Sequence, residues 1–131
     1  MNITTIDKNA INNDPYTARD EIDVNIGIIL KRLGIATHKK SYFVIRRCIR
    51  MVVDNPNETQ YITKEVYPSV AREFRTSAAA IERSIRSAIS SIHCSEEDLI
   101  ACIGWRSINY TNKQIVSGIA EVVRDSKNSL R

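Results

Sequence analysis

The sequence contains little of what a β-sheet protein needs. Its 131 residues include only four glycines, three prolines and 6% aromatic residues. Alternating Val- and Thr-rich runs bounded by turn pairs are missing, so strands and hairpins are not predicted. Apolar residues recur at helical spacing instead. The fold class that remains is all-α, with a chain length that suits one domain and a modest core.

The sequence also lacks a long apolar run. No segment approaches the roughly 18 apolar residues that suggest a membrane span. The N-terminus has neither the basic start nor the apolar centre of a signal peptide. These absences predict a cytoplasmic protein without a membrane partner.

Patterns of metal binding and catalysis are missing as well. The three cysteines, Cys48, Cys94 and Cys102, form no C-x-x-C pair, and the histidines, His38 and His93, are far apart. A structural zinc ion needs four ligands, so free thiols are predicted in place of a metal site or disulfides. No carboxylate pair, nucleophile–base set or glycine-rich phosphate loop is present. The sequence therefore predicts neither an enzyme nor a cofactor.

Positive charge is concentrated in one part of the chain, although the net charge is only +4. No acidic residue occurs between Val24 and Val53. The same segment holds seven cations: Lys31, Arg32, Lys39, Lys40, Arg46, Arg47 and Arg50. Segregated charge favours a polyanionic partner such as nucleic acid. A solvated basic face without a partner is the alternative.

Helical periodicity divides the chain into an arm and one domain. Residues 1–18 are polar and contain Pro15, which predicts a flexible N-terminal arm. Residues 19–131 form the domain. Three of its helices are predicted over residues 18–33, 40–54 and 113–126, and a short one follows Ser95. Gly34 is a fitting terminator of the first helix.

The segment from residue 63 to residue 92 predicts two helices separated by a short break. Thr63 is the predicted N-cap of the first, and Thr76 or Ser77 caps the second. The second helix, about residues 77–92, has a buried stripe of Ile81, Ile85, Ala88, Ile89 and Ile92. The small Ala71 lies ten residues before this stripe begins, and that arrangement resembles a helix-turn-helix.

In a helix-turn-helix, the start of the second helix enters the major groove of DNA. The exposed side of this helix supplies the base-reading candidates Glu82, Arg83, Arg86 and Ser87. Arg83 is the best of them, because its guanidinium can pair with guanine O6 and N7. Glu82 can instead pair with Arg86 one turn later. The candidates for phosphate contacts are Lys64, Arg72, Arg75, Thr76 and Ser77. The alternative is an ordinary surface helix with a solvated charged face and no role in binding.

Four strings of residues resemble one known family. They are ILKRLGIATHKKSY at residues 29–42, ITKEVYPSVAREF at 62–74, AIERSIRSAI at 80–89 and TNKQIVSGIAE at 111–121. In these strings, and over about residues 20–126, the chain resembles the C-terminal DNA-binding effector domain of the stage-zero sporulation response regulators. The resemblance implies a compact six-helix bundle around the helix-turn-helix. It also implies sequence-specific binding of duplex DNA at a promoter element and regulation of sporulation transcription.

The resemblance further implies contact with an RNA polymerase sigma subunit and a homodimer on tandem sites. Two residues depart from the family pattern. Ala80 stands where a basic base-contacting residue is usual, and Ser87 stands where histidine is usual. Since a lost bidentate contact costs about 1–3 kcal/mol at one base pair, the target is expected to be relaxed or different.

Only about 20 polar residues precede the first predicted helix, so the sequence holds no phosphoacceptor receiver domain. If the chain is complete, it is expected to act as a stand-alone regulator, without dimerisation driven by its own phosphorylation. The alternative function is a protein-interaction modulator. Such a modulator would bind a sigma subunit or a full-length regulator of the same family.

Overall fold

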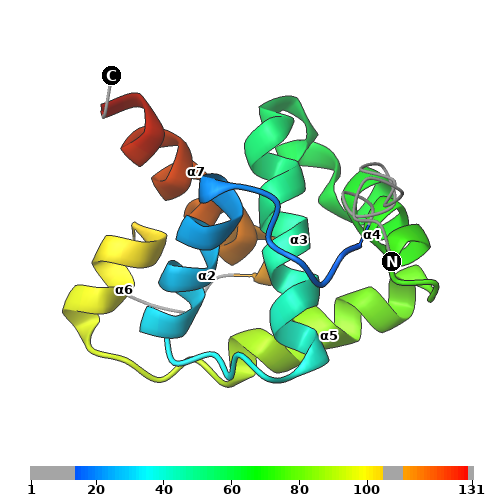
Figure 1. Cartoon of the computed structure of the whole chain (residues 1–131), viewed down its shortest axis with the longest axis horizontal. Coiled ribbons are helices and arrows are strands. Elements are labelled where there is room, and N and C mark those ends of the chain that lie inside the picture. The colour runs from blue at the N-terminus through cyan, green and yellow to red at the C-terminus, as the bar shows by residue number, and fades with distance from the viewer. Residues whose placement is uncertain (1–13, 105–110, 130–131) are drawn as a thin grey trace, which may run out of the picture.

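The computed structural model describes residues 14–104 and 111–129, which form helices joined by turns and irregular segments (Figure 1). The α-helices are α2 (Glu21–Arg32), α3 (Lys40–Asp54), α4 (Tyr67–Glu73), α5 (Ala78–Ser90), α6 (Glu96–Ile103) and α7 (Asn112–Ser129). A 3-10 helix, η2 (Pro56–Tyr61), and a π-helical turn, η3 (Ile62–Val66), join α3 to α4. No strand occurs in these described ranges. The predicted all-α class is confirmed.

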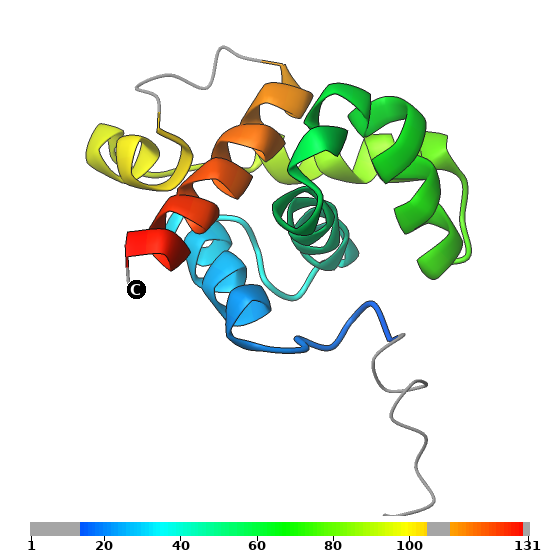
Figure 2. The ribbon, with the colours of Figure 1, turned by 90° about the horizontal axis from the view of Figure 1, so that it is seen from above.

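Helix α3 occupies the centre of the bundle. It packs against α2, α5 and α7, which surround it in both views (Figures 1 and 2). Its apolar stripe is buried and consists of Tyr42, Ile45, Ile49, Val52 and Val53. The core therefore forms around α3, and the other helices cover it with one apolar face each.

Helix boundaries follow the local capping chemistry. Helix α2 begins at Glu21, later than predicted, because the Asp20 side chain accepts a hydrogen bond from the backbone N–H of Asp23 at 3.1 Å. This N-cap satisfies one of the unpaired donors at the helix start. Helix α3 has the predicted bounds and ends before Pro56. None of the helices within the described ranges is long and apolar enough to cross a membrane.

The prediction that Thr63 caps a helix is wrong. Thr63 lies inside the π-helical turn η3, where the N–H of Tyr67 donates to the carbonyl of Ile62, five residues back. Pro68 lies in the first turn of α4, which begins at Tyr67. Because proline has no N–H, it cannot donate to the carbonyl four residues before it, which interrupts the regular α-helical ladder there.

Most of the predicted N-terminal arm, residues 1–13, lies outside the described residues. The following short stretch contacts the domain. Tyr16 packs edge-on against the rings of Phe43 and Phe74, with centroids 5.3 Å and 5.2 Å away. Arg46 donates a 3.0 Å hydrogen bond to the Tyr16 carbonyl oxygen. These contacts connect the chain before α2 with both α3 and the end of α4.

Candidate nucleic-acid interface

Helices α4 and α5 form the predicted helix-turn-helix. Ala71 on α4 and Ile81 on α5 are both buried, and the two helices contact each other directly. The apolar stripe of α5 packs on the centre of the bundle through α3. A larger side chain at the buried position 71 would overpack the contact between the helices.

The cap of α5 is Ser77. Its hydroxyl oxygen accepts a 3.1 Å hydrogen bond from the backbone N–H of Ala80. Thr76, the other predicted cap, has a different role, since its N–H donates to the carbonyl of Ala71 at 2.9 Å. The first turn of α5 carries only alanine side chains, so its backbone can approach a partner closely.

All four base-reading candidates, Glu82, Arg83, Arg86 and Ser87, are exposed on α5. Within the described part of the chain, Arg83 has no ion pair or hydrogen bond through its side chain. The alternative partner predicted for Glu82 is present, since its Oε1 lies 3.8 Å from Nη2 of Arg86. Both of these side chains are at least half exposed, so their ion pair is weak and open to competition.

The phosphate candidates lie on η3, on α4 and in the turn before α5. Lys64, Arg72, Arg75 and Ser77 are exposed, whereas Thr76 is half-buried. Arg72 donates a 3.1 Å hydrogen bond to the Ser69 hydroxyl. The structure thus places all of these candidates on the helix-turn-helix or immediately before it.

The turn between α4 and α5 has an unusual residue at its tightest point. Arg75 has φ +55°, in the left-handed region that favours glycine. The N–H groups of Arg75 and Thr76 donate to the carbonyls of Arg72 and Ala71 in a Schellman motif. Gly34 occupies the same place in an equivalent motif at the end of α2, with φ +86°. Arginine therefore takes a strained position that glycine takes elsewhere in this chain.

We expect Arg75→Gly to make the protein more stable and its anion binding weaker. Glycine adopts the left-handed conformation without the steric cost that arginine has, but it loses more conformational entropy on folding. The net effect should raise the free energy of unfolding by about 0.5–1 kcal/mol. Loss of the exposed cation should weaken duplex DNA binding about three- to tenfold. Urea unfolding and fluorescence anisotropy measure the two effects. Arg75→Lys, which keeps both strain and charge, should change neither; a stability gain in that control would contradict the explanation.

The acid-free segment, residues 24–53, has fewer free cations in the structure than its composition suggests, because some of them pair with carboxylates from other segments. Arg47 donates two hydrogen bonds to Glu73, at 2.6 Å and 2.9 Å. Arg50 pairs with three carboxylates, those of Asp20, Asp23 and Asp54. These cations stabilise the bundle and do not supply a positive surface. Lys31, Lys39 and Lys40 of the segment are exposed and have no ion pair with any residue that the structure describes.

The cysteines are free, as predicted. Burial raises the pKa of the Cys48 thiol far above its usual range, so this thiol stays protonated and unreactive. No group of three or more metal-binding side chains occurs among the described residues.

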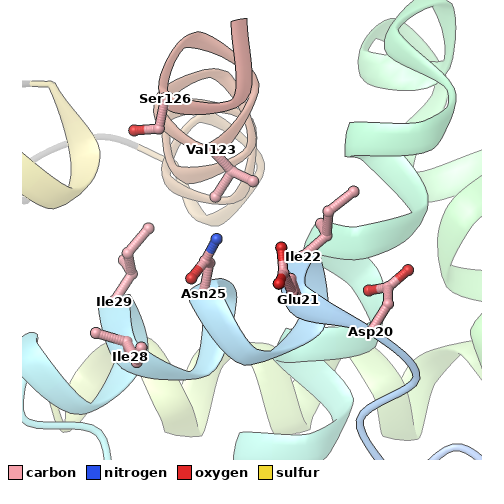
Figure 3. Close-up of a pocket in the computed structure, with 8 residues that line it drawn as sticks. All are labelled: Asp20, Glu21, Ile22, Asn25, Ile28, Ile29, Val123 and Ser126. Atoms are coloured by element: carbon pink, nitrogen blue, oxygen red, sulfur yellow. The ribbon is translucent and has the colours of Figure 1, made fainter. Parts of the chain in front are cut away.

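A groove of about 760 Å³ lies elsewhere, between α2 and the end of α7 (Figure 3). Ile22, Ile28 and Ile29 line it from α2, and Val123 lines it from α7. Asp20 and Glu21 lie at one end. It contains none of the candidate residues on α5, so the proposed nucleic-acid surface is separate from this groove.

The structure brings one further segment beside the candidate residues of α5 that the sequence did not place there. Thr111, Asn112 and Lys113, at the start of α7, share a cleft with Glu82 and Arg86 on α5. Thr111 with Gln114 has the spacing of a capping box, which marks a helix start. The spacing carries no information on what lies opposite, so only the fold could reveal this neighbour.

Comparison with known families covers most of the chain. The model described as Sporulation initiation factor Spo0A C terminal matches residues 26–125. The match begins within α2 and ends within α7, and so includes the whole helix-turn-helix.

Proposed function

This chain belongs to the family of Spo0A C-terminal domains, and we propose that it regulates transcription by inserting α5 into the major groove of a promoter element. In Spo0A this domain is a DNA-binding regulator of transcription and not an enzyme. The proposal for this chain adds the reading helix, the residues that contact bases and those that contact phosphates.

The geometry of α5 carries the proposal. One face is fixed in the core by Ile81, Ile85, Ala88 and Ile89. The opposite face presents Arg83 and Arg86 to solvent. A helix that is rigidly held on one side, with exposed guanidinium groups on the other, suits a major groove that is wide enough for one helix. Arg83 reads a guanine, and Glu82, Arg86 and Ser87 contact neighbouring positions.

The phosphate contacts come from the flanking elements. Lys64, Arg72 and Arg75 supply charge, and Thr76 and Ser77 supply hydroxyl groups beside the start of α5. Cytoplasmic location, a sigma-subunit contact and pairing of two copies on tandem sites complete the proposal.

We expect Arg83→Ala and Lys64→Ala to weaken DNA binding in different ways. Loss of the bidentate contact by Arg83 should cost about 1–3 kcal/mol at one base pair and relax the preference there. Loss of Lys64 should weaken binding about equally on all sequences and lower the slope of log K against log salt by about 1. Selection of sites from a random duplex pool, followed by anisotropy titrations at several salt concentrations, measures both.

An equal loss on all sequences for both variants would remove Arg83 from base reading and leave DNA binding intact. Absence of any selected motif and of any salt-dependent shift in the wild-type protein would contradict the function itself. Retained capture of a purified sigma subunit would then favour the protein-interaction modulator.

A further inference from the structure

A polar cleft of about 430 Å³ lies beside the recognition surface, between α5 and the first turn of α7. Glu82 and Arg86 line it from α5, Thr63 and Tyr67 from the region before and within α4, and Lys113 from α7. Figure 2 shows the first turn of α7 next to α4 and α5. Glu82 and Arg86 line the cleft, whereas Arg83, which follows Glu82 on α5 and is also exposed, does not. The cleft therefore borders the proposed reading face.

The start of α7 has free hydrogen-bond donors at this cleft. Thr111 and Gln114 cap each other, since the Thr111 N–H donates to Gln114 Oε1 at 2.8 Å and the Gln114 N–H donates to Thr111 Oγ1 at 3.2 Å. The capping leaves the N–H groups of Asn112 and Lys113, which have no acceptor within the described ranges. Unpaired N–H groups and the positive end of the helix dipole favour an anion at this place.

A buried hydroxyl independently indicates a polar occupant. Tyr67 is only 2% exposed, and its hydroxyl has no hydrogen-bond partner among the residues described. An unsatisfied buried hydroxyl is unfavourable, so such groups need an explanation. Burial, then the nearby Cys48 and Glu82, raises the pKa of Tyr67, so its hydroxyl remains a proton donor. A ligand in the cleft, or a water molecule held by it, can accept a hydrogen bond from this hydroxyl.

The charge of the cleft selects the sign of the ligand. Arg86 and Lys113 contribute two positive charges, against one negative charge from Glu82. The Glu82 carboxylate is already 3.8 Å from Arg86, and the Lys113 side chain is exposed and has no ion pair in the described residues. A monoanion that is hydrogen-bonded by backbone amides fits this balance, and a phosphodiester is such an anion.

We infer that the first turn of α7, with Lys113, binds one phosphodiester of the DNA strand that borders the groove occupied by α5. The inference rests on the proposed function and extends it to an element outside the helix-turn-helix. A contact on this flank would add a phosphate contact from outside the helix-turn-helix to those made by η3, α4 and the turn.

The test uses the full chain and the duplex selected with it. Neutral methylphosphonate linkages are placed one at a time along each strand, and binding is measured by anisotropy for the wild-type protein, Lys113→Gln and Lys31→Gln.

The wild-type protein should lose about three- to tenfold in affinity at the linkage that faces α7. Lys113→Gln should show that loss on the unmodified duplex and none further at this linkage. Its salt slope should fall by about 1. Lys31, an exposed lysine on α2 outside the cleft, is the matched control and should behave as wild type at that linkage.

Three results overturn the inference. If the wild-type protein binds the selected duplex but no linkage depends on Lys113, the site at α7 fails and the proposed function stands. If Lys113-dependent binding of inorganic phosphate is found by calorimetry without any linkage effect, the site takes free phosphate and not DNA. If the wild-type protein binds no duplex, both proposals fail together.

Discussion

Gly34→Ala should lower the free energy of unfolding by about 2–5 kcal/mol, a large part of the total stability of an ordinary domain. Two costs add. A left-handed conformation costs a residue with a Cβ about 1–2 kcal/mol, and Gly34 has φ +86°. A Cβ at this position would also lie 2.4 Å from the carbonyl oxygen of His93. That backbone cannot easily move away, because the His93 N–H donates a 2.8 Å hydrogen bond to Leu33.

Gly104→Ala is the matched control for this prediction. Gly104 has φ +89°, and no heavy atom of the described chain lies within 4 Å of a Cβ built there. It should therefore cost only the conformational part, about 1–2 kcal/mol. Urea unfolding followed by far-UV circular dichroism gives both values. Equal losses in the two variants would show that the contact with His93 contributes nothing.

The contact at Gly34 matters for DNA binding as well as for stability. It connects the end of α2 to the segment that follows α5. Movement of His93 away from an added Cβ would shift the end of the proposed reading helix. Gly34→Ala protein that remains folded is thus expected to bind DNA more weakly than Gly104→Ala protein.

Arg50→Met should lower the free energy of unfolding by about 2–4 kcal/mol at pH 7, because removal of one partner leaves the opposite charges uncompensated. The Arg50 side chain is only 13% exposed, and it pairs with Asp20, Asp23 and Asp54. Without it, three carboxylates are left close together, and Asp23 is nearly buried. Arg32→Met is the control. Arg32 also pairs with a carboxylate, that of Asp98, but is 53% exposed, so solvent screens the pair and its loss should cost much less than the loss of Arg50.

The pH dependence of the Arg50 effect has a definite sign. The hydrogen bond from Arg50 lowers the pKa of Asp20 below its usual 3.8. A lowered carboxyl pKa contributes stability that is present above the unfolded-state pKa and is lost as pH falls through the folded-state pKa. In Arg50→Met this contribution is absent, and acid relieves the repulsion among the carboxylates. The difference between the two proteins should therefore be largest at pH 7 and shrink below about pH 4. A constant difference from pH 7 to pH 3 would contradict the ionic origin.

The helices were largely predictable from the sequence because each is amphipathic over more residues than the uncertainty in its predicted ends. The stripes of α3 and α5 lie on the core as predicted, and Gly34 and Pro56 end their helices through local chemistry. The failure at Thr63 has a local cause too. Pro68 interrupts the hydrogen-bond ladder in a way that a capping pattern does not reveal.

The candidate site was predictable to the extent that it lies on one continuous segment. The base-reading and phosphate candidates fall between residues 64 and 87, so helical periodicity alone predicts which of them are exposed. Two features of the site depend on residues far away in the chain. The start of α7 lies beside α5 although 21 residues separate the two helices, and Arg75 has a left-handed backbone that no residue pattern predicts.

The charge of the segment from residue 24 to residue 53 shows most clearly what the sequence does not determine, namely which cations are paired. Composition alone determines that this segment carries cations and no acids. Only the tertiary structure decides that Arg47 faces Glu73 and that Arg50 faces three aspartates. The periodicity of apolar residues is a local property of residues that lie close together in the sequence. The sequence by itself therefore determined the helices, their buried faces and the exposed arginines of α5. Ion pairs and clefts depend on distances between helices, which are set by packing of the whole core.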